Sequence, residues 1–152
     1  MLFENKRGER FALRLVGYQF PDGDDALNWL NIEIDAVFAS VAWRATDPAL
    51  ETFEVAALAD WLEGLAAEAP TQESLHFTEP NLVFKRLAGD GREVHVRVQV
   101  RGELRPRPAI DSFGAKVHAD FALDAVALRR ASGSLRVQLQ RFPPRDEPDP
   151  DT

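Results

Sequence analysis

The feature that most constrains the fold is a strict alternation of apolar and polar residues that recurs along the chain. Its clearest example is residues 93–101, where every second residue from Val94 to Val100 is a valine and the residues between are charged or polar. Successive side chains of a strand point to opposite faces, so this pattern places all the valines on one face. One face in the core and one in water is typical of an antiparallel sheet.

The same alternation predicts further strands. In residues 9–18, Phe11, Leu13 and Leu15 alternate with Ala12, Arg14 and Val16, which predicts a strand with at least one buried face. A second alternating segment runs from Asn28 to Thr46. The second segment is too long for one flat strand, so we expect a bulge or bend near residues 36–40. Shorter alternating runs lie at residues 75–77, 82–84 and 117–123. Pro80 and Asn81 favour a β-turn between the first two of these runs, with Asn81 in the left-handed conformation of a type II turn. A continuous edge strand with Pro80 at a bulge is the alternative.

Two segments follow a helical period instead. Apolar residues from Val55 to Leu65 recur at spacings of three and four, which predicts a helix over about residues 52–68 with Thr52 as its N-cap. Asp124 can cap a second helix over about residues 124–141. Residues 133–141 also satisfy the alternating pattern of a strand, so the choice between helix and strand stays open there, with helix favoured.

These elements predict an α+β fold, in which an antiparallel sheet of about six or seven strands is covered on its apolar face by the helices. The 152 residues fit one domain, which we expect to span residues 1–142. Residues 143–152 are acidic and rich in proline, and they lack apolar side chains that could offset the entropy of ordering. We therefore expect a disordered tail there.

Composition and charge narrow the classes of function. The chain has no cysteine, which excludes disulfides and sulfur-based zinc sites and fits a cytoplasmic location. Its net charge of -7 argues against binding to nucleic acid or to an anionic membrane, and no segment has the apolar length of a membrane span. An acidic protein fits a basic protein partner, although a charge of this size also serves solubility.

The acidic loop before the second alternating segment is the predicted partner-binding surface. Its carboxylates precede a tryptophan that lies an even number of residues from two further carboxylates on the same predicted strand. An aromatic side chain and acidic groups are therefore expected on one solvent-exposed face. The alternative for the tryptophan is packing beneath a loop or a second layer of structure. The candidate residues are Asp22, Asp24, Asp25, Trp29, Glu33 and Asp35.

No motif in the sequence indicates catalysis, and we expect no cofactor and no catalytic residue. His76, His95 and His118 all fall on predicted strand positions, so a sheet could bring three imidazoles together around a metal. Their spacing does not show that they meet, and solvated surface histidines are the simpler interpretation. The alternative function is therefore a small-ligand-binding protein or metal-dependent enzyme that uses a concave antiparallel sheet.

Several short motifs, taken together, suggest a family. They are Gly17-Tyr18-Gln19-Phe20-Pro21, Asn28-Trp29-Leu30, Leu50-Glu51-Thr52-Phe53-Glu54, Trp61-Leu62, Phe77-Thr78-Glu79-Pro80-Asn81-Leu82 and Arg141-Phe142-Pro143. In this order the chain resembles the WapI-type bacterial immunity proteins and their uncharacterised relatives over nearly its whole length. The resemblance implies a small cytoplasmic non-enzyme that protects its producer by binding the toxin domain of a partner encoded nearby. It implies no particular interface residue, because the matched motifs are typical of strand ends, turns and helix starts.

Overall fold

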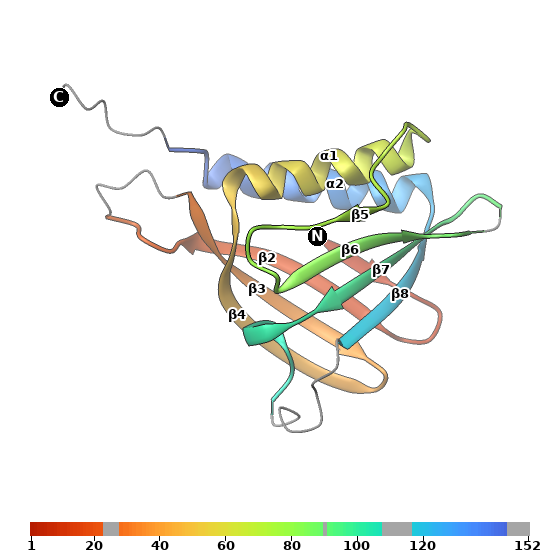
Figure 1. Cartoon of the computed structure of the whole chain (residues 1–152), viewed down its shortest axis with the longest axis horizontal. Coiled ribbons are helices and arrows are strands. Elements are labelled where there is room, and N and C mark those ends of the chain that lie inside the picture. The colour runs from red at the N-terminus through yellow and green to blue at the C-terminus, as the bar shows by residue number, and fades with distance from the viewer. Residues whose placement is uncertain (23–27, 90, 108–116, 146–152) are drawn as a thin grey trace.

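The computed structural model describes residues 1–22, 28–89, 91–107 and 117–145. Within these ranges two helices lie side by side over two β-sheets (Figure 1). The elements, in chain order, are β1 (Leu2–Glu4), β2 (Arg10–Tyr18), β3 (Trp29–Phe38), β4 (Val41–Glu51), α1 (Thr52–Ala66), β5 (Ser74–Leu75), β6 (Leu82–Leu87), β7 (Val94–Val100), the 3-10 helix η1 (Gly102–Leu104), β8 (Val117–Leu123) and α2 (Ala125–Arg141).

The predicted α+β class is confirmed, and the strands divide between two antiparallel sheets of four. Sheet A has the order β1-β2-β3-β4, and sheet B has the order β5-β6-β7-β8. The described residues thus form eight strands in two sheets, where the sequence pattern indicated six or seven in one. The pattern missed β1 because three residues are too few to display a period of two.

A tight hairpin accounts for another difference from the sequence pattern. The bend expected near residues 36–40 is a full reversal, because β3 ends at Phe38 and β4 begins at Val41. The two turn residues, Ala39 and Ser40, have positive φ angles of 46° and 70°. Positive φ at both central residues is the geometry of a two-residue hairpin turn that matches strand twist, and here it is adopted without glycine.

Phenylalanine rings fill the space between the two sheets. Phe11 of sheet A lies 6.0 Å from Phe84 of sheet B between ring centroids, and Phe3 lies 5.7 Å from Phe121. All four side chains are fully buried. The inner faces of the sheets are therefore packed against each other, and the core fills the space between them.

The helices begin at well-defined caps. α1 has Glu51 as its N-cap instead of the predicted Thr52, and the Glu54 carboxylate accepts a hydrogen bond from the Glu51 N–H at 2.9 Å. Asp124 caps α2 as predicted, with its Oδ1 accepting from the Ala127 N–H at 2.8 Å. The open choice for residues 133–141 is decided in favour of helix, since Leu135 packs in the core while Val137 is 58% exposed.

The predicted tail begins beside the sheet. The Tyr18 hydroxyl donates to the Pro143 carbonyl oxygen, and the Arg145 guanidinium lies 4.0 Å from the centroid of the Tyr18 ring. The Arg145 N–H donates to Asn28 Oδ1 at 2.7 Å. Residues 143–145 thus contact the ends of β2 and β3, while the rest of the predicted tail, residues 146–152, lies outside the described residues.

Candidate functional site

The outer face of β3 carries three of the six predicted partner-binding residues. Every second residue of β3 from Leu30 to Phe38 is buried, and the residues between them are half-buried. Trp29, Glu33 and Asp35 belong to the half-buried set and share the outer face, as their common parity predicts. The aromatic side chain and the two carboxylates therefore belong to one surface of sheet A.

The segment that precedes the predicted acidic loop lies beside this surface. The Gln19 N–H donates to the Trp29 carbonyl oxygen at 2.9 Å, so the segment that leads into the loop starts beside Trp29. Asp22 is exposed at the end of that segment. Asp24 and Asp25, the other two predicted residues, lie outside the described residues.

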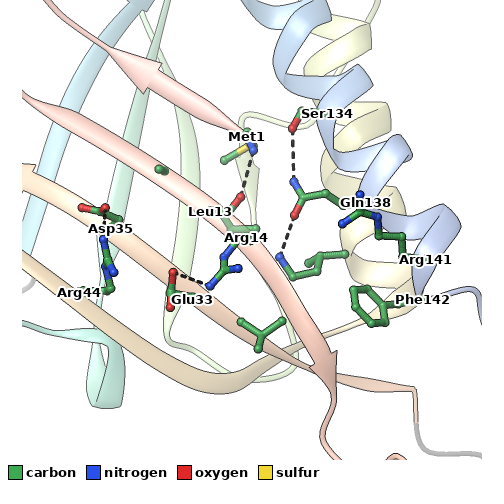
Figure 2. A pocket seen from close by; sticks show the side chains of 13 residues that line it. Met1, Leu13, Arg14, Glu33, Asp35, Arg44, Ser134, Gln138, Arg141 and Phe142 are labelled. Atoms are coloured by element: carbon green, nitrogen blue, oxygen red, sulfur yellow. Dashed lines mark hydrogen bonds and ion pairs between the residues drawn. The ribbon is translucent and has the colours of Figure 1, made fainter.

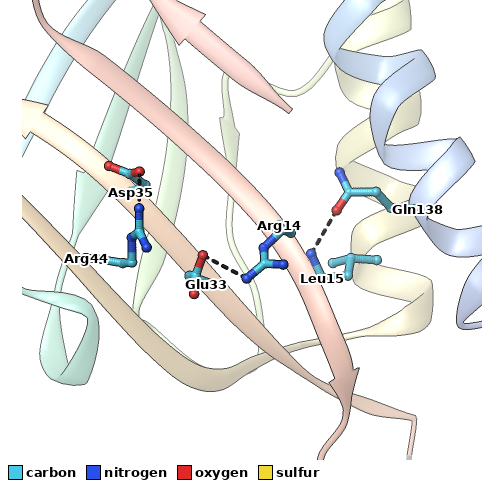
Figure 3. A network of polar contacts seen from close by, with 6 residues as sticks. All are labelled: Arg14, Leu15, Glu33, Asp35, Arg44 and Gln138. Carbon is cyan, nitrogen blue, oxygen red and sulfur yellow. Dashed lines mark hydrogen bonds and ion pairs between the residues drawn. The ribbon is translucent and has the colours of Figure 1, made fainter.

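Arginines of the neighbouring strands contact both carboxylates on β3. Arg14 of β2 stands opposite Glu33 in the strand register, and its Nη2 lies 3.1 Å from Glu33 Oε1 (Figure 3). Asp35 contacts two guanidinium groups, that of Arg10 at 2.7 Å and that of Arg44 at 3.0 Å. Hydrogen bonds from Arg10 and then Arg44 hold the pKa of Asp35 below its ordinary value. The negative charge of this face is thus offset by the protein's own cations.

These arginines are the residues of the site that sequence reasoning missed. Arg10 and Arg14 share the parity opposite to that of Phe11, Leu13 and Leu15, so their exposure on β2 was readable from the alternation. Their pairing with β3 was not, because it depends on the register between two strands.

A groove of about 700 Å³ opens between β2 and the C-terminal half of α2 (Figure 2). The Leu15 N–H points into it and donates to Gln138 Oε1 at 2.8 Å. The lining residues from β2 are Ala12 to Val16, those from β3 and β4 are Glu33, Asp35 and Arg44, and those at the α2 side are Ser134, Gln138, Arg141 and Phe142. The groove is polar and charged, and it is continuous with the outer face of sheet A.

A second polar cluster forms at the corner between β5 and β6. Pro80 and Asn81 make the predicted turn, but Asn81 is not among the residues with positive φ, so the expected left-handed conformation is wrong. Its side chain is 3% exposed and donates to Asp47 Oδ2 at 3.0 Å and to Glu103 Oε2 at 3.1 Å. Burial, followed by repulsion from Glu103 and Glu79, raises the pKa of Asp47. The corner therefore joins the two sheets through a buried amide between carboxylates.

We expect Asp47→Asn to stabilise the protein at pH 7, by less than about 1 kcal/mol. The raised pKa means that the charged carboxylate is less favourable in the folded than in the unfolded state, and asparagine removes that charge while keeping an oxygen for Asn81. The stabilisation by Asp47→Asn should be complete above the pKa that Asp47 has in the folded protein. It should vanish as pH falls below the ordinary pKa of an aspartate, where Asp47 is protonated in both the folded and the unfolded state. Urea denaturation at pH 7 and pH 3 measures it, and equal stabilisation at both pH values would contradict the assignment.

The three histidines are distributed over sheet B and the loop after β5. His95 and His118 share the outer face of sheet B, but His118 stands opposite Gln99, four residues along β7 from His95. Four residues of strand correspond to about 13 Å. The described residues contain no group of three or more His, Cys, Asp or Glu side chains arranged to hold a metal ion. Nor does any helix within the described ranges combine the length and apolar composition needed to cross a membrane.

Comparison with known proteins identifies one family. The immunity protein WapI-like family matches residues 1–143, which includes every helix and strand described above. No curated protein and no solved structure matches the chain. The match confirms the resemblance carried by the short motifs, which lie in β2, β3, α1, the β5–β6 corner and the end of α2. The chain belongs to the WapI-like immunity protein family.

Proposed function

We propose that this protein is a non-enzymatic inhibitor that protects its producer by binding and neutralising a basic toxin domain. The observation that carries the proposal is the family match over residues 1–143. The net charge of -7 supports a basic partner, because complementary charge speeds the encounter of two proteins. The aromatic core supports a binding role, since its rings fill the space between the sheets that a small substrate would otherwise enter.

We further propose that the partner binds the outer face of sheet A together with the acidic loop at its end. The contact residues are Asp22, Asp24, Asp25, Trp29, Glu33 and Asp35. Trp29 supplies apolar contact area, which interfaces concentrate at their centre. Glu33 and Asp35 are 21% and 31% exposed and already bound by arginines, so their role is to hold those arginines in place. The attraction for a basic partner then falls to the loop carboxylates.

Rescue of cells from a toxin tests the proposal. If the gene beside this one encodes a toxin domain, co-expression with that domain should restore growth, and the two purified proteins should form a complex of defined mass. A toxin domain that kills equally well in the presence of this protein, with no complex on a sizing column, would rule the proposal out.

The loop carboxylates should act on the rate of association. We expect Asp24→Lys with Asp25→Lys to slow association with the toxin domain by about threefold to tenfold at low salt and to have little effect at high salt. The matched control is Glu68→Lys with Glu73→Lys, which makes the same change in net charge at exposed positions beyond the C-terminal end of α1. Stopped-flow mixing at two ionic strengths measures both, and equal slowing by the two pairs would show that only net charge matters.

A further inference from the structure

The groove between β2 and α2 borders a strand edge that no other strand covers within the described residues. β1 pairs with Arg10 to Ala12 of β2, and the Met1 backbone extends this pairing to Leu13. β2 itself continues to Tyr18. The Leu15 N–H faces the side of β2 on which β1 lies. There it donates a hydrogen bond to Gln138 Oε1, where a neighbouring strand would otherwise supply a carbonyl oxygen. An edge of this kind is suited to an extended segment of another chain.

Cations outnumber carboxylates at this groove. Its lining holds three arginines, Arg14, Arg44 and Arg141, against two carboxylates, Glu33 and Asp35. Among the described residues both carboxylates already pair with arginines, and Arg10, which lies outside the lining, is a second partner of Asp35. The arginines are also outermost, since Arg14 and Arg44 are 65% and 66% exposed whereas their partners are 21% and 31% exposed. A molecule that approaches the groove therefore meets guanidinium groups before it meets carboxylates.

Arg141 adds a cation from the opposite wall. It projects from the last turn of α2 (Figure 2) and is exposed. Among the described residues no ion pair joins it to a carboxylate. Arg14 lies on the β2 wall of the same groove. Guanidinium groups bind carboxylates through paired hydrogen bonds, and two of them on facing walls can hold successive acidic side chains of one segment. Val16, which is 45% exposed, and Phe142 supply apolar surface between them.

We propose that this groove receives an extended, carboxylate-bearing segment of the partner protein, bound by Arg14 and Arg141. The volume of about 700 Å³ lies within the range of sites that bind small molecules, and a few residues of a peptide are of comparable size. The inference rests on the proposed function, because the partner is taken to be the toxin domain, and it adds the chemistry of one part of that domain. A toxin domain of positive net charge still carries some acidic segments. Because the groove is locally cationic although the whole protein is acidic, it selects such an acidic segment of the toxin domain.

Model peptides test the groove without the toxin. In NMR titrations of the 15N-labelled protein, an acetylated octaglutamate peptide should shift the Leu15 amide, the Gln138 side-chain amide and the Nε signals of Arg14 and Arg141. An octalysine peptide should leave these signals in place. Shifts absent from the groove, or equal shifts with a single-stranded oligothymidine of the same length, would overturn the assignment to an acidic peptide.

Charge-reversal variants test whether Arg14 and Arg141 bind the octaglutamate peptide. Arg14→Glu with Arg141→Glu should abolish the octaglutamate shifts, whereas Arg92→Glu with Arg130→Glu should retain them. The second pair makes the same change in net charge at exposed positions in the β6–β7 hairpin and near the start of α2. Thermal denaturation of each variant confirms that it is folded. Loss of the shifts in both pairs would show that net charge, and not the groove, holds the peptide.

Binding to the toxin domain found in the rescue experiment separates this inference from the proposed function. The Arg14 and Arg141 variant should bind that domain at least about tenfold more weakly than the wild type, and the control pair should not. Equal affinity of the wild type and the groove variant would overturn the groove while leaving the inhibitor function intact. Absence of binding by the wild type would overturn the toxin as the occupant, and the peptide titration would still decide whether the groove binds carboxylates.

Discussion

Phe84→Ala should lower the free energy of unfolding by about 3 to 5 kcal/mol. The ring comes from sheet B and is fully buried. Its centroid lies 6.0 Å from Phe11 and 6.4 Å from Phe3, both of sheet A, 6.4 Å from Trp61 of α1 and 6.1 Å from Phe77. Alanine would leave a cavity where both sheets and a helix meet, and rings held on several sides cannot collapse to fill it.

Denaturation in guanidinium chloride, followed by tryptophan fluorescence, measures this loss. Phe53→Ala is the matched control, because the same atoms are removed from a side chain that is 59% exposed. The control should change stability by less than about 0.5 kcal/mol. Similar losses for the two variants would mean that the sheets do not pack through Phe84.

Glu54→Ala should cost about 2 to 4 kcal/mol of stability. The carboxylate is 5% exposed and accepts two backbone hydrogen bonds, from the Glu51 N–H at 2.9 Å and from the Thr78 N–H at 2.7 Å. It thereby closes the first turn of α1 and holds the segment that leads into the β5–β6 corner. Alanine would leave both N–H groups without an acceptor, and the penalty for an unsatisfied buried group exceeds the net gain from forming the bond.

Hydrogen exchange gives this prediction a local measurement. The Thr78 amide should exchange faster in Glu54→Ala than in the wild type by more than the global loss of stability explains. Glu54→Gln keeps one carbonyl oxygen and should recover about half of the stability. Glu73→Ala, at an exposed position, is the control and should change neither quantity. Unchanged Thr78 exchange in Glu54→Ala would show that the carboxylate does not hold this segment.

Local periodicity was a reliable guide to the elements of this fold. The alternation on β3 and β7 and the three-to-four spacing on α1 appear in the structure with the predicted faces buried. Local pattern was weaker where two templates fitted one segment, as at residues 133–141. There the burial of Leu135 in the core decided in favour of helix. That burial depends on the packing of α2 against α1, and the Ser132 hydroxyl of α2 donates to the Ala59 carbonyl oxygen of α1 at 2.8 Å in the same contact.

The candidate surface was predictable in part, because the alternation along a strand also decides which side chains share a face. Trp29, Glu33 and Asp35 lie on one face because parity alone places them there. The arginines that contact the two carboxylates come from β2 and β4, and only the strand register brings Arg14 opposite Glu33 and Arg44 opposite Asp35. A register shifted by one residue would place these arginines in the core, so the pairing follows from burial across the whole sheet.

The sequence by itself determined the α+β class, the faces of its strands and the apolar stripes of its helices, because these depend on backbone geometry over a few residues. Tertiary structure alone decided that the strands form two sheets packed through phenylalanine rings. It likewise decided that the Leu15 N–H donates a hydrogen bond to Gln138, which lies 123 positions further along the chain. It also decided that arginines surround the carboxylates of sheet A. Contacts between distant segments are selected by the burial of the whole core and by strand register, which no short window of residues contains.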